Sequence, residues 1–422
     1  MESTKATVQV LCRGAVISRA AASNIAIRQS NCSALLFARL NRTFARMNTF
    51  GRIFRFTSFG ESHGAAIGGV IDGMPAGIKV DMELIRTELL RRATGSSCRK
   101  DSESAESGVC HCSGNYSSTR KEEDNVEFLS GLLNGTTLGT PIAFIIRNKD
   151  ARSEDYKDLE HLFRPAHADD TYFHKYGIRD HRGGGRASAR ETAVRVVAGA
   201  FAKMLLKQHN IAVTARVAEI GGIKTVSQSE LPAKTQAKTQ AEPQAKPTAS
   251  NSELPAAATE LLENARKTGD SVGGVIECTV TGAPKTLMGL GEPLYDKLTS
   301  RLASAMMSIN ASRSFEIGQG LQATKMLGSE HNDKWLQDGS TENNYSGGVR
   351  GGISTGEPVI MRVGFKPIPS ISKEQTMLSD NGELIKHSIH GRHDVTCVFR
   401  AVPVVEAMAA VCIADFLLLK NS

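Results

Sequence analysis

The segment 192–203 constrains the fold most, because the helix that it predicts is apolar on every side. It reads TAVRVVAGAFAK, and Arg195 is the only charged residue before Lys203. A helix with one face in water carries polar side chains along that face. This helix is therefore expected to lie buried between other layers. Ser188 and Glu191 have the spacing of a capping box, which predicts that the helix begins there.

Three glycines at 183–185 open this helix and are followed by Arg186, with Arg190 four residues further on. Glycine permits a close backbone approach, a helix N-terminus attracts negative charge, and guanidinium groups bind phosphate through two donors. The pattern therefore suits an anion, most simply a phosphate. The alternative, in which the glycines only form a tight turn and the arginines are solvated, stays open at this level.

A second apolar helix is expected at 402–419. Pro403, Glu406 and Asp415 interrupt it, so we expect no membrane span. Elsewhere, β-prone runs bounded by turn residues predict strands, and capped apolar stretches predict helices. The expected strands are 53–59, 66–72, 126–133, 140–148, 211–220, 271–280 and 359–365, and the other expected helices are 81–92 and 293–307.

The formal net charge of +7 is concentrated in residues 1–46, which contain seven basic residues and one acidic residue. The remainder is close to neutral, which argues against a nucleic-acid-binding surface. The Ala-, Ser- and Arg-rich composition of 1–46 fits an organelle transit peptide, or alternatively an extension upstream of a start at Met47. We expect a cytoplasmic protein, or an organellar one if 1–46 is a transit peptide.

Beyond this extension we expect a single domain, 47–422, with insertions at about 96–120 and 225–268. The first insertion is Ser-rich, and the second contains the near-repeat AKTQAKTQAEPQAKP. Such a polar stretch cannot bury enough apolar surface to fold alone. We therefore expect 225–258 to be a disordered loop.

The eight cysteines have no regular spacing, which indicates reduced thiols in an intracellular protein. The cluster Cys110-His111-Cys112 with nearby Cys98 lacks the C-x-x-C spacing of zinc sites. We therefore expect no metal site.

Three histidines lie in loops crowded with glycine, proline or charge: His63, His167 and His393. Imidazole is the side chain best suited to proton transfer near neutral pH. Each histidine taken alone is more often structural, but their shared setting favours chemistry. The common nucleotide signatures fail, because there is no Walker A lysine loop and the match at Gly318-Gln319-Gly320 lacks a strand–turn–helix context.

Several long motifs, in order, resemble the chorismate synthase family over 48–419. They are 59–64 (FGESHG), 72–75 (DGMP), 163–169 (FRPAHAD), 183–191 (GGGRASARE), 307–311 (MSINA), 351–354 (GGIS), 366–367 (KP) and 391–394 (GRHD), continuing through 401–403 (AVP). The resemblance implies an α+β fold of antiparallel sheets enclosing a central layer of helices, usually assembled as a homotetramer. It also implies a lyase that converts 5-enolpyruvylshikimate-3-phosphate to chorismate and phosphate by a 1,4-anti elimination, using reduced FMN.

The resemblance also implies residue roles. His63 would assist the departing phosphate as an acid, His167 would contact the flavin near N1, and Asp394 would act as a base through flavin N5. The flavin contacts would be Arg186, Ala187, Ser188, Asn310, Ala311, Gly351, Lys366, Pro367, Ile368, Pro369, Ser370 and Arg392.

For the substrate phosphate the family uses paired arginines after the first helix. Arg92 matches one, but the family's Arg-Pro-Gly is Ala93-Thr94-Gly95 here, and Arg99 is the candidate for the second. Ala166 also replaces a usual glycine. These departures concern the geometry of the phosphate site. The resemblance leaves open whether NADPH or a separate source reduces the flavin. A non-catalytic phosphate binder would leave His63 and His167 without a role.

Overall fold

The computed structural model describes residues 48–93, 116, 124–149, 153–225, 254–389 and 393–421. By its internal contacts the chain divides into Met1–Arg46 and Met47–Ser422, and every described residue lies in the second unit. The predictions for 1–46, for most of 96–120 and for 226–253 concern residues outside the described ranges. The same holds for Arg99, Arg392 and the cysteine cluster around His111.

Two five-stranded antiparallel sheets form the outer layers of the second unit. The first has the order β1 (Thr49–Phe50), β2 (Arg55–Phe59), β3 (Ala66–Asp72), β7 (Ile142–Arg147), β4 (Val126–Phe128). The second has the order β10 (Ile223–Lys224), β9 (Ile211–Ile220), β11 (Gly274–Gly282), β15 (Val359–Phe365), β12 (Ser312–Ile317). Strands β3, β9 and β15 begin and end where the sequence predicts.

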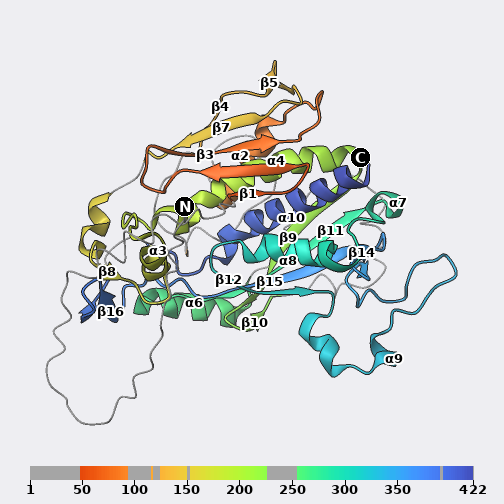
Figure 1. Cartoon of the computed structure of the whole chain (residues 1–422). Coiled ribbons are helices and arrows are strands. Elements are labelled where there is room, and N and C mark those ends of the chain that lie inside the picture. The colour runs from red at the N-terminus through yellow and green to blue at the C-terminus, as the bar shows by residue number, and fades with distance from the viewer. Residues whose placement is uncertain are drawn as a thin grey trace, which may run out of the picture. The chain divides into compact units, whose positions relative to one another are not determined.

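Four helices lie between the sheets: α2 (Met82–Arg92), α4 (Thr192–Gln208), α8 (Leu298–Met307) and α10 (Val398–Lys420). Figure 1 shows α4 and α10 side by side, with α4 contacting β2 and β3 of one sheet and α10 contacting β9 and β11 of the other. This arrangement confirms the expected α+β fold. By length and composition α10 could span a membrane, but 89% of its apolar window is buried, which is the pattern of a core helix.

The start of α4 differs from the predicted capping box. Ser188 Oγ accepts from the backbone N–H of Arg190 at 3.4 Å, which caps a short 3-10 turn, and α4 itself begins at Thr192. The Glu191 carboxylate does not turn back to Ser188, because it accepts from Arg195 Nε at 3.0 Å. The predicted box was wrong: the half-buried Arg195 on the next turn of the helix competes for the carboxylate.

A helix that the sequence reading missed, α6 (Ala256–Thr268), follows the low-complexity segment. Ala258 and Leu262 are fully buried, so the predicted loop ends before Ala258. The apolar positions 258, 262 and 265 give this helix one buried face. Thr225, at the other end of the segment, donates from its backbone N–H to Ala218 O at 2.8 Å.

Smaller elements complete the described fold. A three-stranded sheet has the order β17 (Leu384–His387), β16 (Gln375–Ser379), β8 (Leu162–Phe163). The two-stranded pairs are β5 (Leu132–Leu133) with β6 (Thr136–Thr137) and β13 (Val349–Arg350) with β14 (Ile353–Ser354). The remaining helices are α3 (Asp169–Tyr176), α7 (Pro284–Leu287) and α9 (Gly328–His331), with 3-10 turns at Ser153–Leu159, Gly185–Ala187, Ala189–Glu191, Leu294–Asp296 and Gly320–Lys325.

A buried cluster of four charges ties the helices together. Glu406 of α10 contacts Arg91 of α2 at 2.8 Å and Lys203 of α4 at 2.6 Å, and Lys203 also contacts Glu88 at 3.0 Å. A second oxygen of Glu406 accepts from the backbone N–H of Ala215 in β9 at 2.9 Å. Burial opposes the charge of Glu406, but Lys203 and Arg91 hold its pKa below the ordinary value. The cluster fixes the helical layer against one sheet.

The C-terminal helix also anchors the beginning of the described chain. The Asp415 carboxylate in α10 accepts backbone N–H groups of Arg52 at 2.9 Å, Ile53 at 2.7 Å and Phe54 at 3.1 Å. These three donors lie in the turn between β1 and β2. A single buried side chain therefore supplies the hydrogen bonds of that turn.

Candidate active site

A cavity of about 1710 Å³ lies at the N-terminal ends of α4 and α10, beyond the C-terminal end of α8. Pockets for one small ligand measure roughly 300–1,000 Å³, so this cavity has room for two. The lining is drawn mostly from 164–195, 308–313, 366–370 and 393–408. Helix N-termini attract negative charge, and two of them meet this cavity.

The glycine loop brings two of the predicted histidines together. Gly183, Gly184 and Gly185 all have positive φ angles, of +63°, +83° and +52°. A Cβ atom on Gly183 would lie 2.2 Å from Cε1 of His63, and one on Gly184 would lie 2.9 Å from Cε1 of His167. Both imidazoles therefore pack directly on loop backbone, which only glycine permits here.

His63 sits behind the loop, between Ser62 and Tyr156. Its Nδ1 lies 3.0 Å from Ser62 Oγ, and its ring meets the Tyr156 ring edge-on at 5.0 Å. Tyr156 and Gly183 line the cavity, whereas His63 itself is reached past them. The histidine is half-buried and is held from three directions.

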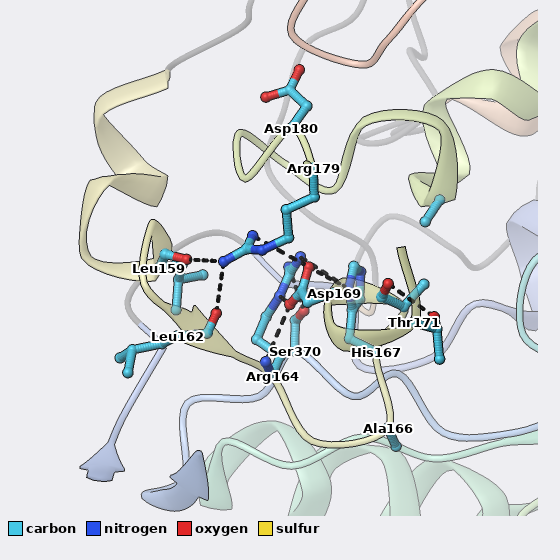
Figure 2. A network of polar contacts seen from close by, with 12 residues as sticks. Leu159, Leu162, Arg164, Ala166, His167, Asp169, Thr171, Arg179, Asp180 and Ser370 are labelled. Carbon is cyan, nitrogen blue, oxygen red and sulfur yellow. Dashed lines mark hydrogen bonds and ion pairs between the residues drawn. The ribbon is translucent and has the colours of Figure 1, made fainter. Parts of the chain in front are cut away.

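His167 belongs to a buried polar network, shown in Figure 2. Its Nδ1 lies 2.9 Å from Asp169 Oδ1, and Asp169 also accepts from Arg164 Nε at 2.7 Å and from Arg164 Nη2 at 2.9 Å. Burial opposes the charge of Asp169, but Arg164 and His167 hold its pKa well below the ordinary range. Asp169 is therefore an anion that orients the imidazole.

The pKa of His167 is lowered, chiefly by burial; the charges of Arg164 and Lys366 act in the same direction, and Asp169 opposes them. His167 Nδ1 lies 2.9 Å from Asp169 Oδ1 and 3.1 Å from Arg164 Nη2, and Nε2 lies on the side of Gly184. The network thus fixes the orientation of this histidine.

The same network joins the histidine loop to its surroundings. Arg164 Nη1 donates to Ser370 Oγ at 3.3 Å, in the predicted cofactor segment. Arg179 Nη2 donates to the carbonyl oxygens of Leu159 at 2.6 Å and Leu162 at 3.0 Å, as Figure 2 shows. These contacts hold the segment before β8 against the loop that carries His167.

Arg186 and Lys366 bring positive charge to the cavity. Arg186 donates to Ser58 Oγ at 2.6 Å and to Gly60 O at 3.2 Å, and Lys366 Nζ donates to Ala166 O. Neither has a carboxylate partner within the described residues. Burial, together with the charge of Arg313, lowers the pKa of Lys366. The cavity is thus electrostatically prepared for an anion.

Arg92 is almost fully buried beside a second arginine that sequence reasoning did not assign to the substrate. Its Nη1 contacts Asp124 Oδ2 at 2.8 Å, and Arg190 contacts the other oxygen of the same carboxylate. Both arginines line the cavity. The sequence placed Arg190 in the anion loop but gave no sign that Asp124, 66 positions earlier, lies beside it.

Asn310 and Ala311 follow α8 and reach the glycine loop. Asn310 Nδ2 donates to Ala187 O at 2.9 Å, while its buried Oδ1 has no hydrogen-bond partner in the described structure. An unpaired buried acceptor calls for an N–H donor from a ligand. With the cations Arg186 and Lys366 nearby, these residues fit an anionic ring system that carries N–H groups, as reduced FMN does.

Asp394 lies at the cavity near the start of α10. Its Oδ2 contacts Arg400 Nη1 at 2.6 Å, and Arg400 Nε donates to Arg92 O at 3.0 Å. The third predicted catalytic residue is thereby connected to the phosphate-binding candidates. Cys397, between them, is half-buried, and desolvation raises its pKa to about 12, so it is a neutral thiol.

Two predicted cofactor residues do not line the cavity, Gly351 and Pro367. Gly351 lies in the β13–β14 turn, where Gly352 O accepts from the backbone N–H of Leu298 at the start of α8. Asn310 follows the other end of that ten-residue helix, about 15 Å away. Arg186, Ala187, Ser188, Asn310, Ala311, Lys366, Ile368, Pro369 and Ser370 do line it.

Comparisons with known proteins agree with this site. The family model described as chorismate synthase matches residues 54–418. A chorismate synthase of Porphyromonas gingivalis is 50% identical over 380 residues, covering 89% of this chain and 97% of the relative. One of Phocaeicola vulgatus is 45% identical over 378 residues, covering 89% and 99%.

A solved structure described as the crystal structure of chorismate synthase has a TM-score of 0.61 and 30% sequence identity to this chain. The alignment covers 88% of this chain and 93% of the solved one. By sequence over nearly its whole described length and by fold, the chain belongs to the chorismate synthase family.

Proposed function

We propose that this enzyme converts 5-enolpyruvylshikimate-3-phosphate to chorismate and inorganic phosphate, as the last step of the shikimate pathway. The observation that carries the proposal is a cavity lined by His167, Asp394 and several arginine and lysine side chains, with His63 packed on Gly183 of its lining loop. Family membership supplies the reaction class, a lyase acting on a phosphate ester. The substrate loses a phosphate from an allylic carbon and a proton from C6 of the ring, so its oxidation level is unchanged.

We place the phosphate of the substrate beside Arg92 and Arg190. Both guanidinium groups line the cavity, and both also contact the Asp124 carboxylate. Two charge-assisted donors also stabilise the negative charge that grows as the C–O bond breaks. Arg99 stays a prediction.

Reduced FMN, when bound, would supply the electron density that assists departure of the allylic phosphate. We assign its binding to the cavity-lining residues Arg186 to Ser188, Asn310, Ala311, Lys366 and Ile368 to Ser370. Gly351, Pro367 and Arg392 stay predictions from the family resemblance. The unpaired Oδ1 of Asn310 and the two unpaired cations are the features that favour a flavin.

The proton carriers have separate tasks. His63, held by Ser62, donates a proton to the leaving phosphate. His167, oriented by Asp169, faces the flavin as a hydrogen-bonding partner. Asp394 accepts the proton that the ring gives up, and its contact with Arg400 keeps the carboxylate in place.

We further propose a homotetramer in the cytoplasm, with NADPH as one source of electrons for the flavin. Bacterial chorismate synthases of similar length are the relatives that favour this location. The tetramer is checked by light scattering of the purified protein.

Turnover of the enolpyruvyl substrate is the direct test. We expect chorismate to form under anaerobic conditions with reduced FMN, over many turnovers per flavin, and none to form with oxidised FMN. A parallel assay with NADPH in air tests flavin reduction by the protein. Oxidation of one flavin per chorismate would refute the redox-neutral reaction.

His63→Ala and His167→Ala are each expected to lower turnover about 10²-fold, the scale of a positioned acid or base. His161→Ala is the control, because that histidine is exposed and pairs only with Asp380 on the surface. Near-normal rates in the first two variants would remove those residues from the mechanism.

A further inference from the structure

Arg313 occupies a β-bulge at the edge of the cavity. In the pairing of β12 with β15, Ser312 faces Phe365 and Ser314 faces Gly364, so Arg313 is the extra residue between them. A bulge redirects the side chain of its extra residue and is common beside active sites. Arg313 lines the cavity.

The backbone around the bulge is fixed on both sides. Ala311 has φ of +65°, a left-handed conformation that is strained for a residue other than glycine. Its carbonyl oxygen accepts from the backbone N–H of Lys366 at 3.0 Å, which locks the start of β12 to the end of β15. Arg313 and Lys366 therefore meet the same part of the cavity.

Neither cation is neutralised there. Arg313 Nη1 donates to the carbonyl oxygen of Ser312, at 3.2 Å, and Lys366 Nζ donates to Ala166 O. In the described part of the chain no carboxylate lies within ion-pair distance of either. The charge of Arg313 also acts on Lys366, whose pKa it helps to lower. Two like charges held together in this way gain from an anion placed between them.

We propose that Arg313 is a ligand-binding residue of this enzyme, which together with Lys366 binds a phosphate monoester group. The inference rests on the proposed function, because that function supplies two such groups, the phosphate of FMN and the phosphate of the substrate. A guanidinium fork beside an ammonium group suits the several oxygens of a phosphate dianion. The bulge is what places the guanidinium there.

The test compares ligands with and without phosphate. FMN and riboflavin are titrated into the wild-type protein and into Arg313→Ala and Arg313→Lys, with flavin fluorescence as the readout. The substrate and its dephosphorylated analogue are titrated by calorimetry in the presence of oxidised FMN. Arg86→Ala, which removes an exposed arginine paired with Glu83, is the matched control.

For one of the two phosphorylated ligands, Arg313→Ala is expected to weaken binding about tenfold or more, with less than about a twofold change for its dephosphorylated counterpart. Arg313→Lys should restore most of that affinity, and Arg86→Ala should match the wild type. The ligand that responds identifies which phosphate is bound. Arg313→Met provides a second neutral variant if the alanine protein is poorly folded.

The proposal is wrong if Arg313→Ala leaves the preference for phosphorylated over dephosphorylated ligand unchanged in both titrations. It is also wrong if Arg313→Ala weakens the binding of a phosphorylated ligand and of its dephosphorylated counterpart equally. A wild-type protein that binds neither FMN nor the substrate would instead refute the proposed function.

Discussion

Replacing Gly183 by alanine tests whether the glycine loop positions His63. The added Cβ would lie 2.2 Å from Cε1 and 2.4 Å from Nδ1 of the imidazole. The ring must then retreat by roughly 1 Å to reach ordinary contact, and a misplacement of about 1 Å lowers turnover on the order of 10²-fold. The left-handed backbone at φ +63° adds about 1–2 kcal/mol of destabilisation.

Gly135→Ala is the matched control. Gly135 has a similar φ of +72°, but a Cβ added there would meet no atom within 4 Å. Both variants should therefore lose similar free energy of unfolding in urea, while only Gly183→Ala loses turnover with reduced FMN under anaerobic conditions. If the two variants turn over at the same rate, the loop does not position His63.

Three further predictions concern acid sensitivity, the core and the low-complexity segment. Since burial lowers the pKa of His167, its neutral form stabilises the fold fully above the unfolded-state pKa of about 6.5, and this contribution is lost as pH falls through the folded-state pKa. In urea denaturation, His167→Gln should thus lose less stability on acidification than the wild type, and an identical pH dependence would contradict this. Glu406→Gln should lower the free energy of unfolding by about 3–5 kcal/mol, because it leaves the buried charges of Arg91 and Lys203 without a full counter-charge. The control Glu83→Gln, at an exposed ion pair, should change it by about 1 kcal/mol at most. Equal losses in the two variants would contradict the buried pairing. A short Gly/Ser linker in place of 226–253 should leave activity and assembly unchanged in kinetic and size-exclusion assays, and loss of either would show that the segment takes part.

The sequence predicted the elements whose signals are local. Burial of α4 and α10 follows from their composition, and the Asp81 cap of α2 follows from one side chain that accepts from the Leu84 N–H at 2.9 Å. Helix α6 was missed because its weakly apolar face follows a long polar segment. The strand pair β8 with β16 joins residues more than 200 positions apart, and no local pattern announces such pairing.

In the site, too, local motifs could be predicted from the sequence, whereas contacts between distant segments could not. Motifs identified the glycine loop and His167, but the contact between that loop and both histidines depends on three positive φ angles that only the folded chain reveals. Asp124 was not predicted, because nothing in the sequence around a single aspartate indicates that it pairs with Arg92 and Arg190. Arg313 was not predicted, because a bulge is a property of strand pairing that no local pattern shows.

The anchoring of the β1–β2 turn by Asp415 bears on how the protein is made. Translation proceeds from the N-terminus, so Arg52, Ile53 and Phe54 emerge early, but the carboxylate that accepts their N–H groups lies more than 360 positions later. Helix α10, which packs between the two sheets, arrives equally late. Folding during synthesis therefore cannot complete the core before α10 has emerged. Ribosome-bound chains truncated before α10 should accordingly stay protease-sensitive, whereas chains in which α10 has left the ribosome should be resistant.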